Sequence, residues 1–306
     1  MHHFEKPAAA ATRTAVSFAR AMKPASFRYH APSTVDEAVA LLAEVAPQDG
    51  RVLAGGQSLV PAMAFRLARP AHLVDINGVG ELGRLAVEGR ELCIGACVRH
   101  EAFHRPVAPG PLGQLLSQVV RHIAHYPIRT RGTFCGSVAH ADPASEWCAV
   151  AVALDATMVA RSVRATRSIP ARAFFAGIMT TTLAEDELLT EVRLPLLPDA
   201  ARCGFYEFSR RAGDFAIAMA VTIHRVVDGR IADARIAVGG AEPSARRIAA
   251  AEQALDGRPP EPAVFAAAAD AAAHDVDPME DILTSARYRR YLVRTVTRRA
   301  LEQSLT

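Results

Sequence analysis

The sequence lacks the features of a membrane-spanning or secreted protein. Its longest apolar runs, such as residues 148–154, fall far short of the ~20 residues that a membrane-spanning helix needs. Residues 1–21 contain no continuous apolar stretch followed by a cleavage site, which argues against a secretory signal. The five cysteines are odd in number and unevenly spaced, as is typical of a reduced protein with free thiols. We therefore expect a cytoplasmic protein without a membrane span.

The sequence also lacks a concentration of positive charge. Its formal net charge is only +3 over 306 residues, and the basic residues of segment 287–299 alternate with apolar ones. Nucleic-acid binding needs a clustered basic face, so we expect no nucleic-acid partner. Internal repeats and heptads are absent as well. A globular chain of this length, half of it apolar, is expected to form two domains.

The first part of the chain mixes helices and strands. We predict a flexible extension at residues 1–25, followed by a domain at 26–200. Thr34 and Glu37 form a capping box that starts its first helix. The periodicity of the apolar residues predicts strands at 51–54, 72–76, 91–98, 157–161 and 187–194, and helices at 33–45, 113–126 and 149–155.

The pattern changes after two prolines in segment 194–202. Three alternating runs, at 204–211, 216–227 and 230–240, predict strands. The dipeptide Asp228-Gly229 between the last two is a strong hairpin signal. Helices are predicted at 244–255, 263–274 and 285–301. The fold class is therefore α+β, with residues 201–306 forming a small three-stranded antiparallel sheet with helices.

Three motifs suggest chemistry but lack the context that it requires. Gly78, Gly80 and Gly83 match the dinucleotide fingerprint G-x-G-x-x-G, but a strand follows where that motif needs a helix, so we interpret them as a turn. Cys93 and Cys97 lack a second pair at metal spacing, and we expect no metal site. Cys135 follows a turn where the pKa of a thiol can be lowered, but no base for a nucleophile is identified.

Two short segments share a format that suits an anionic ligand. "AGGQS" (residues 54–58) and "TFCGS" (residues 133–137) each follow an ordered element, contain small residues and end in a hydroxyl. Successive backbone N–H groups in such turns form anion-binding nests, and glycine lets the backbone approach closely. Two such loops in one domain could hold a diphosphate between them. This pattern does not name the ligand.

Longer stretches around both segments resemble a known family. "VLAGGQSLVPAMAFRLARPAHLVDI" and "RTRGTFCGSVAHADPASEWCAVAVALDA" are similar to the signature regions of the FAD-binding medium subunits of molybdenum hydroxylases, which include carbon monoxide, nicotine and xanthine dehydrogenases. "FYEFSRRAGDFAIAMAV" resembles the start of that family's C-terminal domain. The resemblance implies two α/β subdomains of the vanillyl-alcohol-oxidase type, followed by the small C-terminal domain.

The resemblance also implies which residues contact FAD. Both loops would clasp the pyrophosphate, with Asp142 and Glu146 near the ribityl chain. Leu189 and Ile123, the latter on the preceding helix, would pack on the isoalloxazine ring. The residues implied for the two loops are Leu53, Ala54, Gly55, Gly56, Gln57, Ser58, Leu59, Thr133, Cys135, Gly136 and Ser137.

The chain departs from the family pattern at three places. Cys135 stands where the family commonly has glycine, Phe134 stands in place of an isoleucine, and a lysine that many relatives carry near Glu207 is absent. These departures leave the flavin's redox tuning and its electron acceptor open.

The family implies an oxidoreductase subunit with no catalytic acid or base of its own. FAD would carry electrons from the [2Fe–2S] clusters of a small subunit to an external acceptor, while a large subunit with molybdenum–pterin oxidises the substrate. The chain itself lacks the cysteine clusters that [2Fe–2S] centres need. We expect a dimer of heterotrimers. The alternatives are a self-sufficient flavoprotein oxidase and a non-catalytic FAD-binding assembly subunit.

Overall fold

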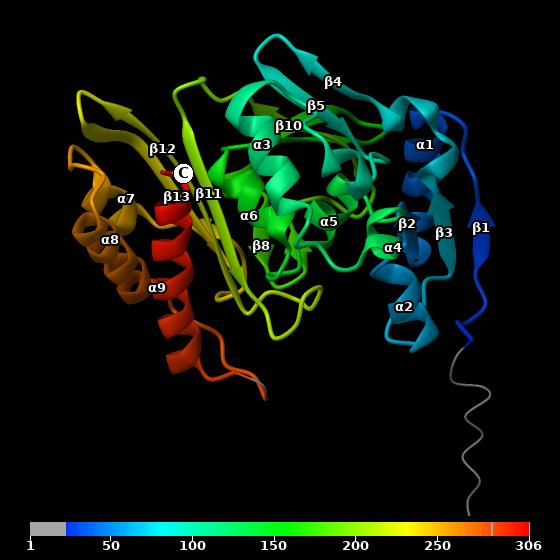
Figure 1. Cartoon of the computed structure of the whole chain (residues 1–306). Coiled ribbons are helices and arrows are strands. Elements are labelled where there is room, and N and C mark those ends of the chain that lie inside the picture. Colours follow the sequence, from blue (N-terminus) through cyan, green and yellow to red (C-terminus); the bar gives the residue numbers. More distant parts are fainter. Residues whose placement is uncertain (1–22, 283, 306) are drawn as a thin grey trace, which may run out of the picture.

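The computed structural model describes residues 23–282 and 284–305. Most of the predicted extension therefore lies outside the described residues. Three sheets follow one another across the molecule, from the N-terminal sheet with α1 on the right of Figure 1 to the C-terminal sheet with α7–α9 on the left.

The first sheet is small and parallel. Its strands β1 (Arg28–His30), β3 (His72–Asp75) and β2 (Gly50–Leu53) lie in the order β1-β3-β2. Helix α1 (Val35–Val45) begins where the Thr34 hydroxyl accepts a hydrogen bond from the Glu37 N–H, as the capping box predicts, and it buries its apolar stripe. A short 3-10 helix (Ala46–Gln48) and α2 (Leu59–Ala64) complete this part.

The second sheet is antiparallel and has five strands in the order β4-β5-β10-β6-β7. The strands are β4 (Leu85–Glu88), β5 (Glu91–Gly95), β6 (Thr157–Arg161), β7 (Thr166–Pro170) and β10 (Leu188–Pro195). The helices are α3 (Gly110–Val119), α4 (Tyr126–Arg129), α5 (Phe134–His140) and α6 (Glu146–Ala153). Short 3-10 turns occupy Ile76–Gly78, Gly80–Gly83, His100–His104 and Ala171–Ala173, and strands β8 (Phe175–Gly177) and β9 (Thr180–Thr181) form a hairpin.

Two predictions for this part have clear outcomes. Residues 78–83 form only 3-10 turns before β4, so the prediction that the glycine motif opens no long helix is confirmed. The helix predicted at 113–126 is wrong at its C-terminal end, because α3 stops at Val119. Ala124 has a φ of 43°, in the left-handed region, which no continuous α-helix contains.

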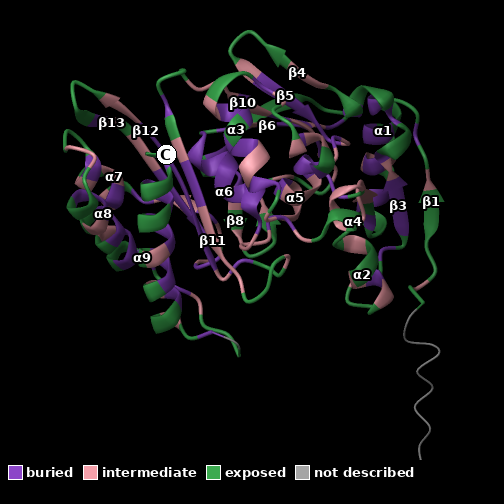
Figure 2. Ribbon diagram, viewed as in Figure 1, coloured by how far each residue is buried: buried purple, intermediate pink, exposed green. Residues whose placement is uncertain are grey.

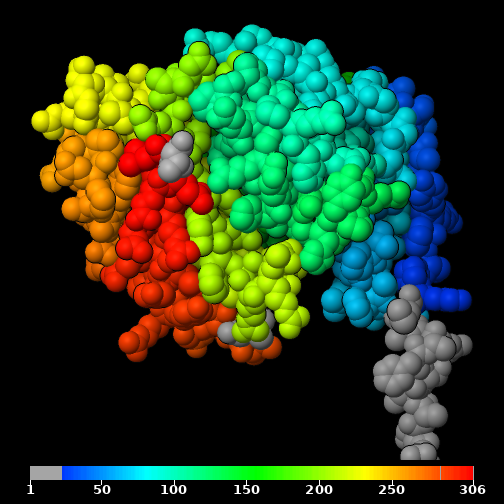
Figure 3. Space-filling model, viewed as in Figure 1, coloured from blue at the N-terminus to red at the C-terminus, as the bar shows by residue number. Residues whose placement is uncertain are grey.

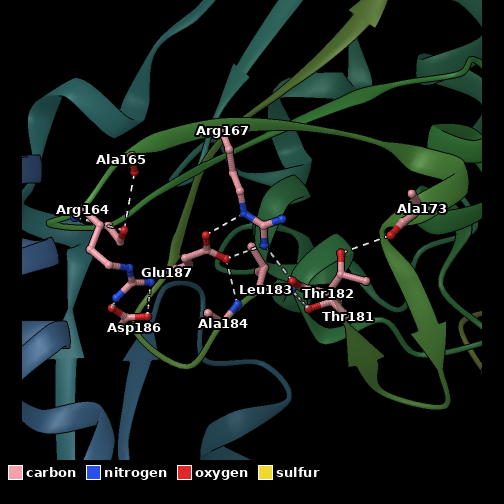
Figure 4. A network of polar contacts seen from close by, with 11 residues as sticks. Arg164, Ala165, Arg167, Ala173, Thr181, Thr182, Leu183, Ala184, Asp186 and Glu187 are labelled. Carbon is pink, nitrogen blue, oxygen red and sulfur yellow. Dashed lines mark hydrogen bonds and ion pairs between the residues drawn. The ribbon is translucent and has the colours of Figure 1, made fainter.

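Two arginine–carboxylate pairs connect the β6–β7 region to the segment that leads into β10 (Figure 4). Arg167 donates to both carboxylate oxygens of Glu187 at 2.6 and 2.7 Å, and to the carbonyl oxygen of Thr182. Arg164 pairs in the same two-pronged way with Asp186. These side chains tie the end of β6 and the start of β7 to the entrance of β10.

The third sheet has four strands where the sequence predicts three. Its order is β11 (Arg202–Phe208), β12 (Ala218–Val227), β13 (Arg230–Gly239) and β14 (Arg246–Arg247). The hairpin prediction is confirmed, since Asp228 and Gly229 have φ values of 50° and 72° between β12 and β13. The prediction of a helix from residue 244 is wrong, because Arg246 and Arg247 pair with Val238 and Ala237 as β14.

Both faces of this third sheet are covered. Helices α7 (Ala249–Leu255), α8 (Pro262–Asp275) and α9 (Ala286–Gln303) cover one face. Their apolar side chains and those of β12 and β13 form a second buried cluster there. Helix α6 packs against β12 and β13 on the other face. All eight residues of α6 are buried, and Figure 2 shows this helix in purple between the sheets. Over residues 23–282 and 284–305, no helix is both long and apolar enough to cross a membrane.

Candidate functional site

A cleft of about 480 Å³ lies where the three parts of the chain meet. In Figure 3 the surface is hollowed between the blue α2 region and the yellow-green segment that follows β11. Of the residues predicted to bind a cofactor, those that line the cleft are Leu53, Ala54, Gly55, Gly56, Gln57, Ser58, Leu59, Ile123, Thr133, Gly136, Ser137, Asp142 and Glu146. Cys135 and Leu189 do not line it.

The first loop follows β2 and lies against the segment that precedes α5. A Cβ atom on Gly55 would stand 2.4 Å from the Arg131 carbonyl oxygen and 2.6 Å from the Gly132 Cα. Gly56 has a φ of +71°, in the region that favours glycine. Glycine at both positions therefore allows the loop to turn and to touch the second segment.

A polar network fixes the two segments to each other. The Asn77 side-chain amide donates to the Ala54 carbonyl oxygen at 2.8 Å, and its backbone N–H donates to Asp75 at 2.9 Å. The Arg99 guanidinium donates both to the Asn77 side-chain oxygen and to the Arg131 carbonyl oxygen. Arg99 thus bridges the first loop, through Asn77, to the segment that precedes α5.

The second segment is the start of a helix, where the sequence predicts a turn. The Thr133 hydroxyl accepts a hydrogen bond from the Gly136 N–H at 3.0 Å and so caps α5. The Cys135 thiol points into the core, with its Sγ atom 3.3 Å from the Ile94 carbonyl oxygen. Burial raises the pKa of this thiol far above its usual range, so it stays protonated and is no nucleophile.

Phe134 has a packing role in this segment. Its ring is fully buried, with its centroid 4.7 Å from Trp147 and 5.5 Å from Phe103. The Trp147 indole N–H donates to Nδ1 of His100 at 2.9 Å. Burial, followed by the charges of nearby arginines, lowers the pKa of His100 to about 3, so this cleft residue is neutral near pH 7.

The opposite wall of the cleft is acidic. Asp142 accepts a hydrogen bond from the Ala144 N–H at 2.8 Å, and the Ser137 and Ser145 hydroxyls lie 2.8 Å apart. Glu146 is the first residue of α6 and is only 7% exposed. Burial, followed by repulsion from Asp142, raises its pKa to about 7.

A second carboxyl lies behind Glu146. Glu207 comes from β11, and its Oε2 atom is buried without a hydrogen-bond partner among the described residues. Burial and the charge of Glu146 raise the pKa of Glu207 to about 9. The two carboxyl groups are within hydrogen-bonding reach of each other.

The two apolar residues predicted to contact the flavin ring have different positions. Ile123 lies after the end of α3, in the turn before α4, and lines the cleft. Leu189 lies in β10 next to a register shift and packs in the core. The structure thus brings Ile123, but not Leu189, to the surface of the cleft.

Several lining residues were not predicted from the sequence. The most informative are Gly213, Asp214 and Phe215, which lie after β11 and reach the cleft from the C-terminal part. Gly213 has a φ of +86° and lies so close to His125 that a Cβ atom would stand 2.4 Å from that ring. The Gly-Asp dipeptide lies within the motif "FYEFSRRAGDFAIAMAV" and signals a turn, but the motif does not place that turn at the cleft. The other lining residues are Arg51, Val52, His100, Ala124, Ile128, Gly132, Ala139, His140, Ala144 and Ser145.

Family comparisons cover nearly the whole described chain. Residues 25–197 match the family described as the FAD binding domain in molybdopterin dehydrogenase, and residues 204–304 match the CO dehydrogenase flavoprotein C-terminal domain. The chain belongs to the FAD-binding medium subunits of the molybdenum hydroxylases. The predicted family, its mixed fold and its cofactor, FAD, are therefore confirmed, as is the assignment to an oxidoreductase.

Individual relatives agree along almost their full length. The nicotine 6-hydroxylase medium subunit of Paenarthrobacter nicotinovorans is 38% identical over 92% of this chain and 99% of its own. The carbon monoxide dehydrogenase of Hydrogenophaga pseudoflava has a chain with a TM-score of 0.89 at 36% identity, covering 93% of this chain and 99% of its own. Quinoline 2-oxidoreductase from Pseudomonas putida 86 gives 0.86 at 35% identity, with 92% and 98% covered.

Proposed function

We propose that the chain binds FAD in this cleft and passes electrons from the [2Fe–2S] clusters of a partner subunit to an external acceptor. The observation that carries the proposal is the contact of two glycine-containing segments at Gly55, with the cleft between these segments and the acidic wall. We likewise propose that residues 26–200 form the FAD-binding domain and residues 201–306 the C-terminal domain.

The residues of the cleft fit such a ligand. At Gly56 a Cβ atom would stand 3.1 Å from a Val60 methyl group and 3.2 Å from a Leu53 methyl group, so the first loop has little room for a larger residue there. The backbone around Gly55, Thr133 and Gly136 would hold the pyrophosphate, with the Ser58 and Ser137 hydroxyls beside it. Glu146 would accept a hydrogen bond from the ribityl chain, and Ile123 would face the ring.

The cofactor would supply the redox chemistry, because bound FAD can exchange electrons one at a time and in pairs. The chain's own residues would position it and exclude water from one side. Among the described residues, no group of three or more histidine, cysteine or acidic side chains could hold a metal ion. The iron–sulfur clusters and the molybdenum–pterin would therefore belong to partner chains.

We propose a small [2Fe–2S] subunit and a large molybdenum-binding subunit as these partners, in a dimer of heterotrimers. Relatives are described as medium subunits or medium chains, which supports an assembly of several subunits. All five cysteines are free, which is consistent with a reducing, cytoplasmic environment.

The test of FAD binding uses the full chain alone. We expect the flavin-free chain to bind added FAD, to quench its fluorescence and to become yellow, while oxidising no organic substrate. A chain that stays colourless at saturating FAD would overturn the proposal. Substrate turnover by the chain alone would instead indicate a self-sufficient oxidase.

The test of electron transfer uses the complex with its co-purifying subunits. When the partners are reduced by substrate under anaerobic conditions, the flavin absorbance should bleach, and an added acceptor should restore it. Reduced iron–sulfur clusters beside a flavin that stays oxidised would show a non-catalytic assembly subunit.

A further inference from the structure

Glu146 and Glu207 form a pair of buried carboxyl groups, and neither belongs to a metal site or to an ion pair among the described residues. Glu146 faces the cleft from the start of α6, and Glu207 lies behind it on β11. The two groups are within hydrogen-bonding reach, and Glu207 Oε2 is buried without a partner among the described residues. Two neighbouring buried carboxylates would repel each other strongly if both were ionised, so one of them retains a proton.

Among the described residues, none of the charged groups named as shifting the pKa of either carboxyl is positive. The charged groups that act on Glu146 are Asp142, from the turn before α6, and Glu207; the group that acts on Glu207 is Glu146. The thiol of Cys148, two residues further along α6, is kept neutral by burial. His122, which follows α3 and packs edge-on against Phe205 of β11, is also biased to its neutral form by burial.

The position of the proton follows from the elements that carry the two side chains. Glu146 begins a helix, and its own backbone N–H stabilises the carboxylate there. Glu207 lies within a strand, and a bare buried oxygen is far less costly in a neutral acid than in a charged carboxylate. The protonated partner is therefore Glu207.

We propose that Glu207 is a positioning residue that donates a shared proton to the Glu146 carboxylate and thereby holds it as a singly charged acceptor for FAD. The proposal rests on the FAD binding proposed above. In its protonated form the pair carries one negative charge. If the pair lost its proton, two negative charges would lie beside the site of an anionic dinucleotide, and FAD would bind less tightly.

The experiment measures the FAD dissociation constant of the full chain from about pH 6 to about pH 10. Loss of one proton on which binding depends raises this constant by up to about tenfold per pH unit. We expect the wild-type constant to rise in the alkaline range. Glu207→Gln keeps a neutral hydrogen-bond donor, so it should bind FAD at neutral pH as the wild type does and remove the alkaline rise. Glu207→Leu lacks the donor and should weaken binding at all pH values.

The control variant is Glu81→Gln, which removes an exposed carboxylate far along the chain from the cleft-lining residues and should reproduce the wild-type curve. A second readout needs no FAD. The infrared C=O band of a protonated carboxyl should be present in the flavin-free chain at mildly alkaline pH and absent in Glu207→Gln.

The outcomes separate this inference from the proposed function. Failure of the wild-type chain to bind FAD would overturn the proposed function, and the infrared band would still decide whether the pair shares a proton. Tight FAD binding with the same alkaline dependence in wild type and Glu207→Gln would overturn the inference alone. A wild-type chain without the infrared band would overturn it as well.

Discussion

At the scale of single residues, the glycines of the first loop show what the sequence could and could not predict. The pattern of small residues indicated close backbone approach, and Gly56 indeed has a positive φ. What approaches Gly55, namely the backbone at Arg131 and Gly132, is more than seventy positions away in the sequence and was not predictable from the loop itself. Cys135 shows the reverse limit: the sequence places it in the motif, but only packing shows that its thiol points into the core.

The first prediction concerns Gly56. Gly56→Val should weaken FAD binding by roughly tenfold or more, because a β-branched residue at positive φ costs about 1–3 kcal/mol and its side chain would crowd Val60 and Leu53 in the first loop. Fluorescence titration with FAD measures this. Gly89→Val is the matched control, since Gly89 also has a positive φ but has open space around it in the β4–β5 turn. Equal loss of affinity in both variants would contradict the assignment of the first loop to FAD binding.

The second prediction concerns the pH dependence of stability. Glu207 has a raised pKa of about 9 in the folded chain, so its protonated form stabilises the fold at low pH. This contribution is lost as the pH rises from the ordinary glutamate range through about 9. Glu207→Gln should therefore raise the melting temperature of the flavin-free chain at about pH 9 relative to wild type by a few degrees, with about 1 kcal/mol giving roughly 2–4 °C. An unchanged difference between about pH 6 and about pH 9 would contradict the assigned pKa direction.

At the scale of elements, the sequence predicted those defined by a strong local signal. The capping box at Thr34 and the Asp228-Gly229 hairpin need only neighbouring residues, and both are present. The two-residue strand β14 could not be predicted, because it depends on tertiary contacts. Arg246 and Arg247 pair with β13, and their side chains form ion pairs with Glu242, Asp275, Asp155 and Glu252. Tertiary contacts there override the helical pattern that continues into α7.

The third prediction concerns the connection between the two segments of the site. Arg99→Ala removes the hydrogen bonds to Asn77 and to the Arg131 carbonyl oxygen, so the two walls should separate more readily and FAD should bind about tenfold more weakly, as expected for loss of ~1.4 kcal/mol. The control is Arg84→Ala, which removes only an exposed pair with Glu88. Thermal unfolding followed by circular dichroism distinguishes a local effect from loss of the fold. An Arg99→Ala chain with wild-type affinity would show that the bridge is dispensable.

At the scale of the whole molecule, the cleft is shared between regions that two separate family descriptions cover. Arg51 to Leu59 approach it from the first region, and Gly213 to Phe215 approach it from the second. A ligand that filled the cleft would contact both regions. The sequence motifs indicated an FAD-binding part followed by a C-terminal part. They did not indicate how the segment after β11 folds back over the cleft.

The fourth prediction follows from this shared cleft. The flavin-free chain should unfold in one transition, and FAD at about 100 times its dissociation constant should add ~2.7 kcal/mol of stability, shifting that transition upward as a unit. Differential scanning calorimetry with and without FAD measures this. Two transitions, only one of which moves with FAD, would show that the two regions unfold independently.

The burial of α6 on all sides has a consequence for how this protein can be divided. The main apolar cluster includes Trp147 and Ala149 of α6 together with Phe205, Met219 and Val221 of the third sheet. A chain cut after residue 200 would leave the α6 face without its covering strands, and the remaining fragment would expose the matching face of β12. The boundary between the two family regions, between residues 197 and 204, therefore divides a shared apolar cluster. Attempts to exchange or transplant either region between relatives should carry α6 together with β12 and β13 as one inseparable block.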